Sequence, residues 1–197
     1  RKDTFRFALM THAIGIPKSD MPAHPDFHVP RTNTGVGDFP GGDFIMSLGA
    51  FDDENGLPVG TAFMQASTLL HELGHGMERR HGGDALEPNC KPLYLSVMNY
   101  LYQLRGLADD TGTPHLDFSR EDFTGIAINE TALFDGSLNL LPYRIGYYAP
   151  LATSYLASFG TPVAKHCDGS AILPTDPPMV RIDARTAAGA IDWKADG

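Results

Sequence analysis

The feature that most constrains this chain is the segment of residues 71–81, which reads HELGHGMERRH. On a helix, His71 and His75 lie one above the other about 6 Å apart, so both imidazoles can reach one Zn²⁺ at about 2.0–2.1 Å. Glu72 projects beside the metal, where it can hold a water molecule without taking a coordination position. His81 cannot share this helix face, so the helix must break before it. Three neutral imidazoles with one open position are typical of a catalytic zinc site.

The sequence around this segment predicts an α+β fold. Apolar spacing predicts a helix from about Thr61 to Met77, with Thr61 as N-cap and Phe63, Leu69, Leu70 and Leu73 as its apolar positions. Runs of β-prone residues predict strands at 5–10 and 44–51. Segments 17–42 and 160–197 are rich in turn-forming residues and predict loops. After the helix we expect a turn and a mixed segment over 94–107, with further helices starting at Ser119 and near Asn129.

Length and charge exclude several classes of protein. The 197 residues suit one domain with a full hydrophobic core. The net charge is −9 and the 15 Lys and Arg residues are scattered, which argues against a nucleic-acid binder. No apolar run approaches the roughly 20 residues needed to span a bilayer. We therefore expect no nucleic-acid partner and no membrane span. We also expect a monomer.

Residues 95–100, which read LSVMNY, extend the pattern. Together with residues 71–81 they make the chain resemble the metzincin zinc metallopeptidases, in which HExxHxxGxxH is followed by a Met-containing turn. The resemblance covers residues 61–106 and implies that Met98 lies under the metal as an apolar floor. The Ser-x-Met-x-Tyr form is similar to that of the astacin and serralysin branches. It implies that Tyr100 ligates zinc or donates a hydrogen bond to the transition state, ordinary aromatic packing being the alternative.

The resemblance also implies a fold and a reaction. It implies one catalytic domain over residues 1–197, with a twisted mixed sheet and the active-site helix in an upper subdomain of about 1–81. An irregular lower subdomain of about 82–197 carries the Met-turn. The implied activity is a zinc-dependent endopeptidase acting on extended protein or peptide substrates, in which zinc activates a water molecule and Glu72 is the general base. The candidate edge strand for substrate is 44–51, an ordinary sheet strand being the alternative.

One residue departs from the metzincin pattern. Glu78 stands where the signature has a glycine in the left-handed conformation, which costs a non-glycine residue roughly 1 kcal/mol. Three outcomes stay open: Glu78 tolerates the strain, the turn shifts to Gly76, or Asp84 or Glu87 replaces His81 as a ligand.

Two rival functions also stay open. The first is a catalytically inactive zinc-binding recognition module on a peptidase fold, which the Glu78 departure favours and an intact Glu72 opposes. The second is a gluzincin-type peptidase, whose third ligand is a glutamate on a later helix, with Glu130 as the candidate.

Cysteine usage and the start of the chain suggest an exported protein. Two cysteines are too few for a cysteine-rich zinc scaffold, and we expect a disulfide between Cys90 and Cys167, two separate thiols being the alternative. The chain begins at Arg1 without a signal peptide, so we expect a trimmed part of a longer precursor. Similarity to secreted bacterial metallopeptidases implies an extracellular location.

Other candidate ion sites are weaker. Residues 52–56 and 192–197 could bind Ca²⁺, although surface turns explain them better. His12, His24 and His28 with Asp26 are candidates for a second, structural zinc. None of these three histidines, nor His115 or His166, shows a clear ligand spacing.

Overall fold

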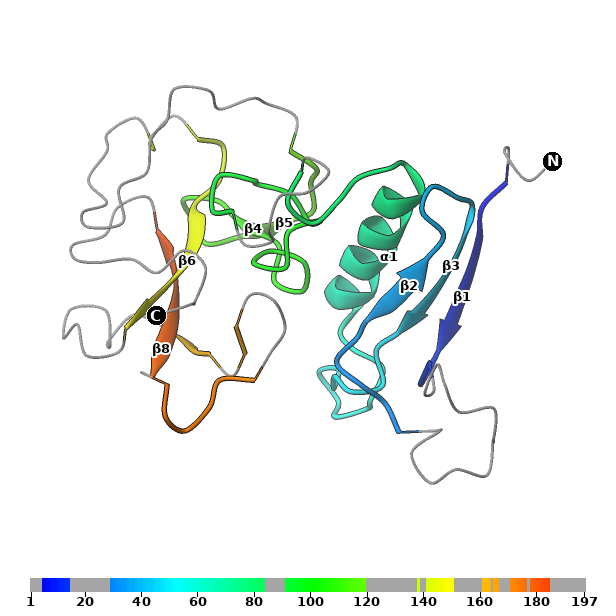
Figure 1. The fold of residues 1–197 in the computed structure, drawn as a ribbon, viewed down its shortest axis with the longest axis horizontal. Helices are drawn as coiled ribbons and strands as arrows, with labels where there is room; N and C mark the ends of the chain where they lie inside the picture. The colour runs from blue at the N-terminus through cyan, green and yellow to red at the C-terminus, as the bar shows by residue number, and fades with distance from the viewer. Residues whose placement is uncertain are drawn as a thin grey trace. The chain divides into compact units, whose positions relative to one another are not determined.

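The computed structural model of the chain describes residues 5–14, 29–83, 91–119, 138, 141–150, 161–163, 165–166, 171–176 and 178–184. The chain divides into two compact units, Arg1–Arg80 and His81–Gly197. Each unit is described by itself below, with its elements labelled in Figure 1. The expected organisation as two subdomains of one catalytic domain stays a prediction.

The first unit contains a three-stranded sheet with a helix against it (Figure 1). Its elements are β1 (Phe7–Thr11), β2 (Gly35–Gly37), β3 (Asp43–Ser47) and α1 (Ala62–Gly76). The strand order is β1-β3-β2, in which β1 runs parallel and β2 antiparallel to β3. Helix α1 packs against β2 and β3. A mixed sheet with a helix is the α+β combination that the sequence predicts.

Helix α1 begins and ends where the sequence predicts. Thr61 is the N-cap, and its Oγ1 accepts a hydrogen bond from the backbone N–H of Met64 at 3.1 Å. The orientation of the helix is less expected, because the predicted apolar position Leu69 is 45% exposed. The buried side chains of α1 are small or polar and include His71 and Glu72. The helix therefore buries the face that carries His71 and Glu72.

The predicted edge strand is wrong. Strand β3 lies between β1 and β2, so both of its edges are already hydrogen-bonded and cannot take up a substrate chain. The edge position next to α1 belongs instead to β2, within the segment predicted to be loop. The sequence Gly35-Val36-Gly37 gives no strand signal because glycine has a low β propensity.

In the described part of the second unit, the regular elements are β-strands joined by turns and irregular segments. It contains β4 (Leu107–Ala108), β5 (Pro114–His115), β6 (Ile145–Pro150), β7 (Thr161–Pro162) and β8 (Met179–Ala184). Strands β4 and β5 form a hairpin, and the other three form a sheet in the order β6-β8-β7. Strand β8 contradicts the loop prediction for its segment. Arg181 interrupts the apolar pattern there, yet it is buried, pairs with Asp183 at 2.8 Å and lies over the Tyr102 ring at 5.8 Å.

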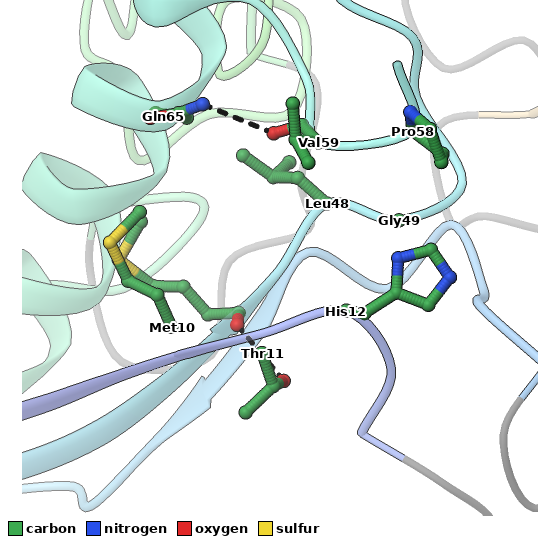
Figure 2. Close-up of a pocket in the computed structure, with 9 residues that line it drawn as sticks. Met10, Thr11, His12, Leu48, Gly49, Pro58, Val59 and Gln65 are labelled. Atoms are coloured by element: carbon green, nitrogen blue, oxygen red, sulfur yellow. Dashed lines mark hydrogen bonds between the residues drawn. The ribbon is translucent and has the colours of Figure 1, made fainter.

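A pocket of about 320 Å³ lies in the first unit beside β1 and β3 (Figure 2). Apolar side chains form most of its wall, which also includes Gln65 of α1, whose side chain donates a hydrogen bond to the Val59 carbonyl at 3.3 Å. His12 lies at its rim. The proposed partners of His12 in a second zinc site lie outside the described residues.

Candidate metal centre

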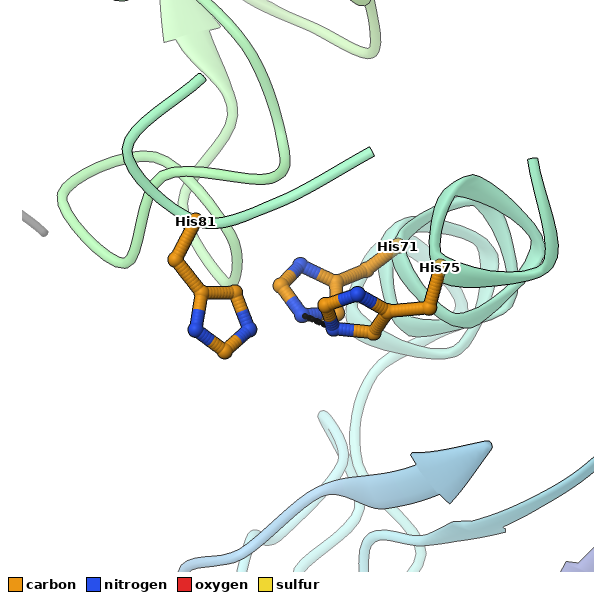
Figure 3. A group of neighbouring side chains, drawn as sticks. All are labelled: His71, His75 and His81. Atoms are coloured by element: carbon orange, nitrogen blue, oxygen red, sulfur yellow. Dashed lines mark hydrogen bonds between the residues drawn. The ribbon is translucent and has the colours of Figure 1, made fainter. Parts of the chain in front are cut away.

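Helix α1 holds two histidines with their ring nitrogens facing each other (Figure 3). The Nε2 atoms of His71 and His75 are 3.1 Å apart. Tetrahedral zinc with Zn–N bonds of about 2.0–2.1 Å requires two ligand nitrogens about 3.3 Å apart. The spacing on the helix therefore fits a shared metal ion closely.

The backbone after the helix orients His75. Its Nδ1 lies 2.9 Å from the Arg79 carbonyl oxygen, which can only accept, so Nδ1 carries the proton and Nε2 is the nitrogen that can bind a metal. Burial lowers the pKa of His75, although the hydrogen bond to Arg79 opposes this. A lowered pKa favours the neutral imidazole that metal binding requires.

Glu78 ends the helix in a left-handed conformation, with φ of 66°. The backbone N–H of Glu78 donates to the His75 carbonyl at 2.9 Å, and that of Arg79 donates to the Gly74 carbonyl at 2.9 Å. This pair of bonds is a Schellman motif, whose left-handed position glycine usually occupies. The sequence left three outcomes open, and the first of them is observed. Glu78 itself takes the left-handed conformation, and the turn does not shift to Gly76.

The strain at Glu78 gives a stability prediction. Glu78→Gly is expected to raise the free energy of unfolding by about 0.5–1 kcal/mol, because glycine adopts the left-handed conformation without a clash. Glu78→Ala is the matched control, since alanine keeps the Cβ and with it the strain. Urea unfolding monitored by circular dichroism measures both. Equal stability of the two variants would contradict a strained Glu78.

The turn at Glu78 leads the chain to His81. The candidate ligand atoms of His71, His75 and His81 all lie within 4.8 Å of one another, and His81 is directed toward the helix histidines (Figure 3). Among the described histidine, cysteine, aspartate and glutamate residues, this is the group that can bind a metal ion. Tyr100 packs its ring against that of His81, with centroids 4.3 Å apart, and stays 44% exposed. Its catalytic role stays a prediction.

Glu72 carries a buried carboxylate next to these ligands. The residue is 3% exposed, and its Oε2 atom has no hydrogen-bond partner among the described residues. Burial raises the pKa of Glu72 to about 7. A buried carboxylate oxygen without a partner is costly and indicates a missing water molecule, proton or cation. Together with the histidine spacing, it supports a metal-dependent site.

Gly35 of β2 makes room for this carboxylate and Gly37 lies beside it, and sequence reasoning missed both. A Cβ atom on Gly35 would lie 2.3 Å from Glu72 Oε1, closer than any real contact. A Cβ atom on Gly37 would lie 3.4 Å from Glu72 Oε2. The alternation Gly-x-Gly at residues 35–37 is the signal that could have identified them.

Hydrogen bonds made by the side chains of Ser96 and Asn99 with the backbone shape the predicted Met-turn. The backbone N–H of Met98 donates to Ser96 Oγ at 3.2 Å, and that of Leu101 donates to Asn99 Oδ1 at 3.1 Å. Asn99 Nδ2 also donates to the Lys91 carbonyl at 2.7 Å. Met98 is fully buried in this turn. Its predicted place beneath the metal stays a prediction, whereas the organising role of Asn99 was not anticipated.

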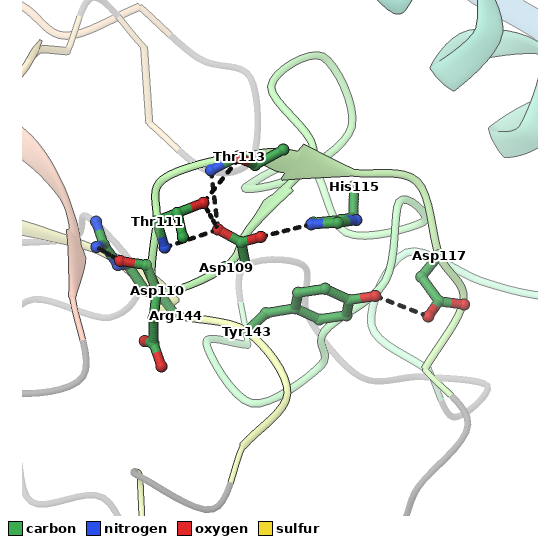
Figure 4. A network of polar contacts seen from close by, with 8 residues as sticks. All are labelled: Asp109, Asp110, Thr111, Thr113, His115, Asp117, Tyr143 and Arg144. Carbon is green, nitrogen blue, oxygen red and sulfur yellow. Dashed lines mark hydrogen bonds and ion pairs between the residues drawn. The ribbon is translucent and has the colours of Figure 1, made fainter.

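His115 belongs to a network that stabilises the β4–β5 hairpin (Figure 4). Its Nε2 lies 2.8 Å from Asp109 Oδ2, while Asp109 Oδ1 accepts hydrogen bonds from the hydroxyl and N–H of Thr111 and the N–H of Thr113. The bonds from the Thr111 hydroxyl and His115 lower the pKa of Asp109. Nearby, the Tyr143 hydroxyl donates to Asp117 at 3.0 Å. These hydrogen bonds stabilise the carboxylates of Asp109 and Asp117, so neither requires a metal ion as a partner.

The acidic turn at residues 52–56 is similarly self-contained. Asp53 Oδ1 accepts the backbone N–H groups of Asn55 and Leu57, both at 2.8 Å, as in an ordinary surface turn. The predictions that concern the following residues lie outside the described part of the chain and stay predictions: His24, Asp26, His28, Asp84, Glu87, Cys90, Glu130, Cys167 and residues 192–197.

Within the described residues, no helix is long and apolar enough to cross a membrane. Comparisons with protein-family models, with curated proteins and with solved structures find no match to this chain.

Proposed function

We propose that the chain is a zinc-dependent endopeptidase of the metzincin type. The observation that carries the proposal is the group formed by His71, His75 and His81 next to a buried glutamate that lacks a hydrogen-bond partner on one carboxylate oxygen. A purely structural zinc site has no need for this carboxylate, because its ligands fill the coordination sphere.

The three histidines would hold the zinc ion, and Glu72 would move the protons. Bound zinc supplies a Lewis acid that activates water and polarises a carbonyl group. Glu72 accepts the proton of the attacking water and donates it to the leaving amine. Tyr100, whose ring lies against His81, donates a hydrogen bond to the oxyanion.

Strand β2 is the candidate platform for the substrate. Among the described strands it has the sheet edge next to α1, and its glycines bring its backbone against the Glu72 carboxylate. An extended peptide can add to such an edge through main-chain hydrogen bonds. Extended binding favours unfolded or loop segments of proteins as substrates.

Metal content and proteolysis test the proposal together. The purified chain is expected to bind one zinc ion by mass spectrometry, to cleave casein, and to lose activity with a chelator and regain it with zinc. His81→Ala is expected to leave the zinc site partly occupied. Unchanged zinc content in that variant would favour the gluzincin alternative. A zinc-loaded chain that cleaves no peptide would favour the inactive recognition module.

A further inference from the structure

One face of the β2 segment is directed toward α1. Side chains alternate along a strand, so Gly35 and Gly37 share a face, and both would place a Cβ atom against Glu72. Phe39 follows two residues after Gly37, in the turn that joins β2 to β3. Its own ring contacts, described next, place it near the helix end.

The Phe39 ring lies beside a candidate metal ligand. Its centroid is 6.2 Å from that of His75, with the rings nearly perpendicular, and the Arg80 guanidinium lies 4.6 Å from it. The turn is held against the helix end, where the Arg6 guanidinium donates to the Gly41 carbonyl. A Cβ atom on Gly76 would lie 2.6 Å from that same carbonyl oxygen. The ring is therefore positioned by its surroundings, yet it remains 41% exposed.

We infer that Phe39 is the wall of an apolar subsite that selects a large apolar side chain of the substrate near the scissile bond. This inference rests on the proposed function. A peptide that pairs with the edge of β2 passes Glu72 where the strand presents two glycines, Gly35 and Gly37, and the Phe39 ring lies in the turn that follows the strand. An exposed ring offers apolar area that a substrate side chain can bury, and it offers a peptide no backbone hydrogen bond. Phe39 is therefore a specificity residue.

A peptide library tests this subsite. The zinc-loaded chain is incubated with the library, and cleavage sites are identified by mass spectrometry. We expect Phe, Leu or Met at one fixed position within two residues of the cleaved bond. Phe39→Ala is expected to lower kcat/KM for such peptides about 10-fold. For peptides with Ala at that position, kcat/KM should stay unchanged. Phe39→Leu should retain most of the preference.

Leu57→Ala is the matched control, because Leu57 is 56% exposed and precedes the opposite end of α1. A preference unchanged in Phe39→Ala would overturn the inference, as would a preference for acidic residues that Arg80→Ala removes. A library in which nothing is cleaved would instead refute the proposed function.

A binding measurement separates failure of the Phe39 subsite from failure of the proposed peptidase function. Fluorescence anisotropy of a labelled apolar peptide on the Glu72→Gln variant is expected to give a Kd that Phe39→Ala raises about 10-fold. An unchanged Kd would overturn the role of Phe39 even where cleavage is not observed.

Discussion

Glu72→Gln is expected to lower kcat for peptide cleavage by about 10²–10⁴-fold, the usual contribution of a general acid–base residue. Glutamine keeps the size and shape of the side chain but cannot accept the proton of the attacking water. The three candidate ligands are unchanged, so zinc content should stay at one ion per chain. Steady-state cleavage of a fluorogenic peptide and metal analysis of the same preparation measure the two quantities.

The control for this variant is Glu54→Gln, which changes the charge equally at an exposed residue of the 52–56 turn. It should leave cleavage unaltered. A Glu72→Gln variant with normal kcat would remove the proton-transfer role from Glu72. Loss of zinc in that variant would instead make Glu72 part of the metal-binding site.

The sequence predicted the three-histidine group well because most of its members are close together in the chain. The spacing of His71, Glu72 and His75 depends only on helix geometry. The helix also begins after Thr61 and ends before Met77, as expected. The position of His81 depended on whether Glu78 could take a left-handed conformation. Spacing alone left this open, because the strain of about 1–2 kcal/mol is small enough for the surrounding structure to compensate.

The sheet was harder to predict because its signals are not local. Hydrophobic pattern identified β3, but the neighbours of β3 are set by pairing with β1 and β2. Strand β2 has almost no side chains, so neither its existence nor its edge position could be inferred from propensity. Strand β8 was missed for a different reason. A charged Arg181 does not look like a buried strand residue in the sequence, and it is stabilised by partners distant in the chain such as the Leu101 carbonyl.

Gly35, which the sequence did not single out, gives the second large expected effect on kcat. Gly35→Ala is expected to lower kcat about 100-fold, because the new Cβ atom would lie 2.3 Å from Glu72 Oε1 and must displace the carboxylate. Misplacing a catalytic group by about 1 Å can cost this much. Gly35 does not need a positive φ, and the obstructing atom is the end of a flexible side chain, so the fold should tolerate alanine.

The matched control is Gly37→Ala, on the same face of the same strand. Its Cβ atom would contact Glu72 Oε2 at 3.4 Å, an ordinary van der Waals distance, and Phe44 Cβ at 3.1 Å. We expect a much smaller loss of kcat from it, with KM and zinc content near those of the unmodified chain in both variants. Equal losses from the two substitutions would indicate general damage to β2. A normal kcat in Gly35→Ala would show that the general base has room to move without cost, and that the close approach of β2 does not position it.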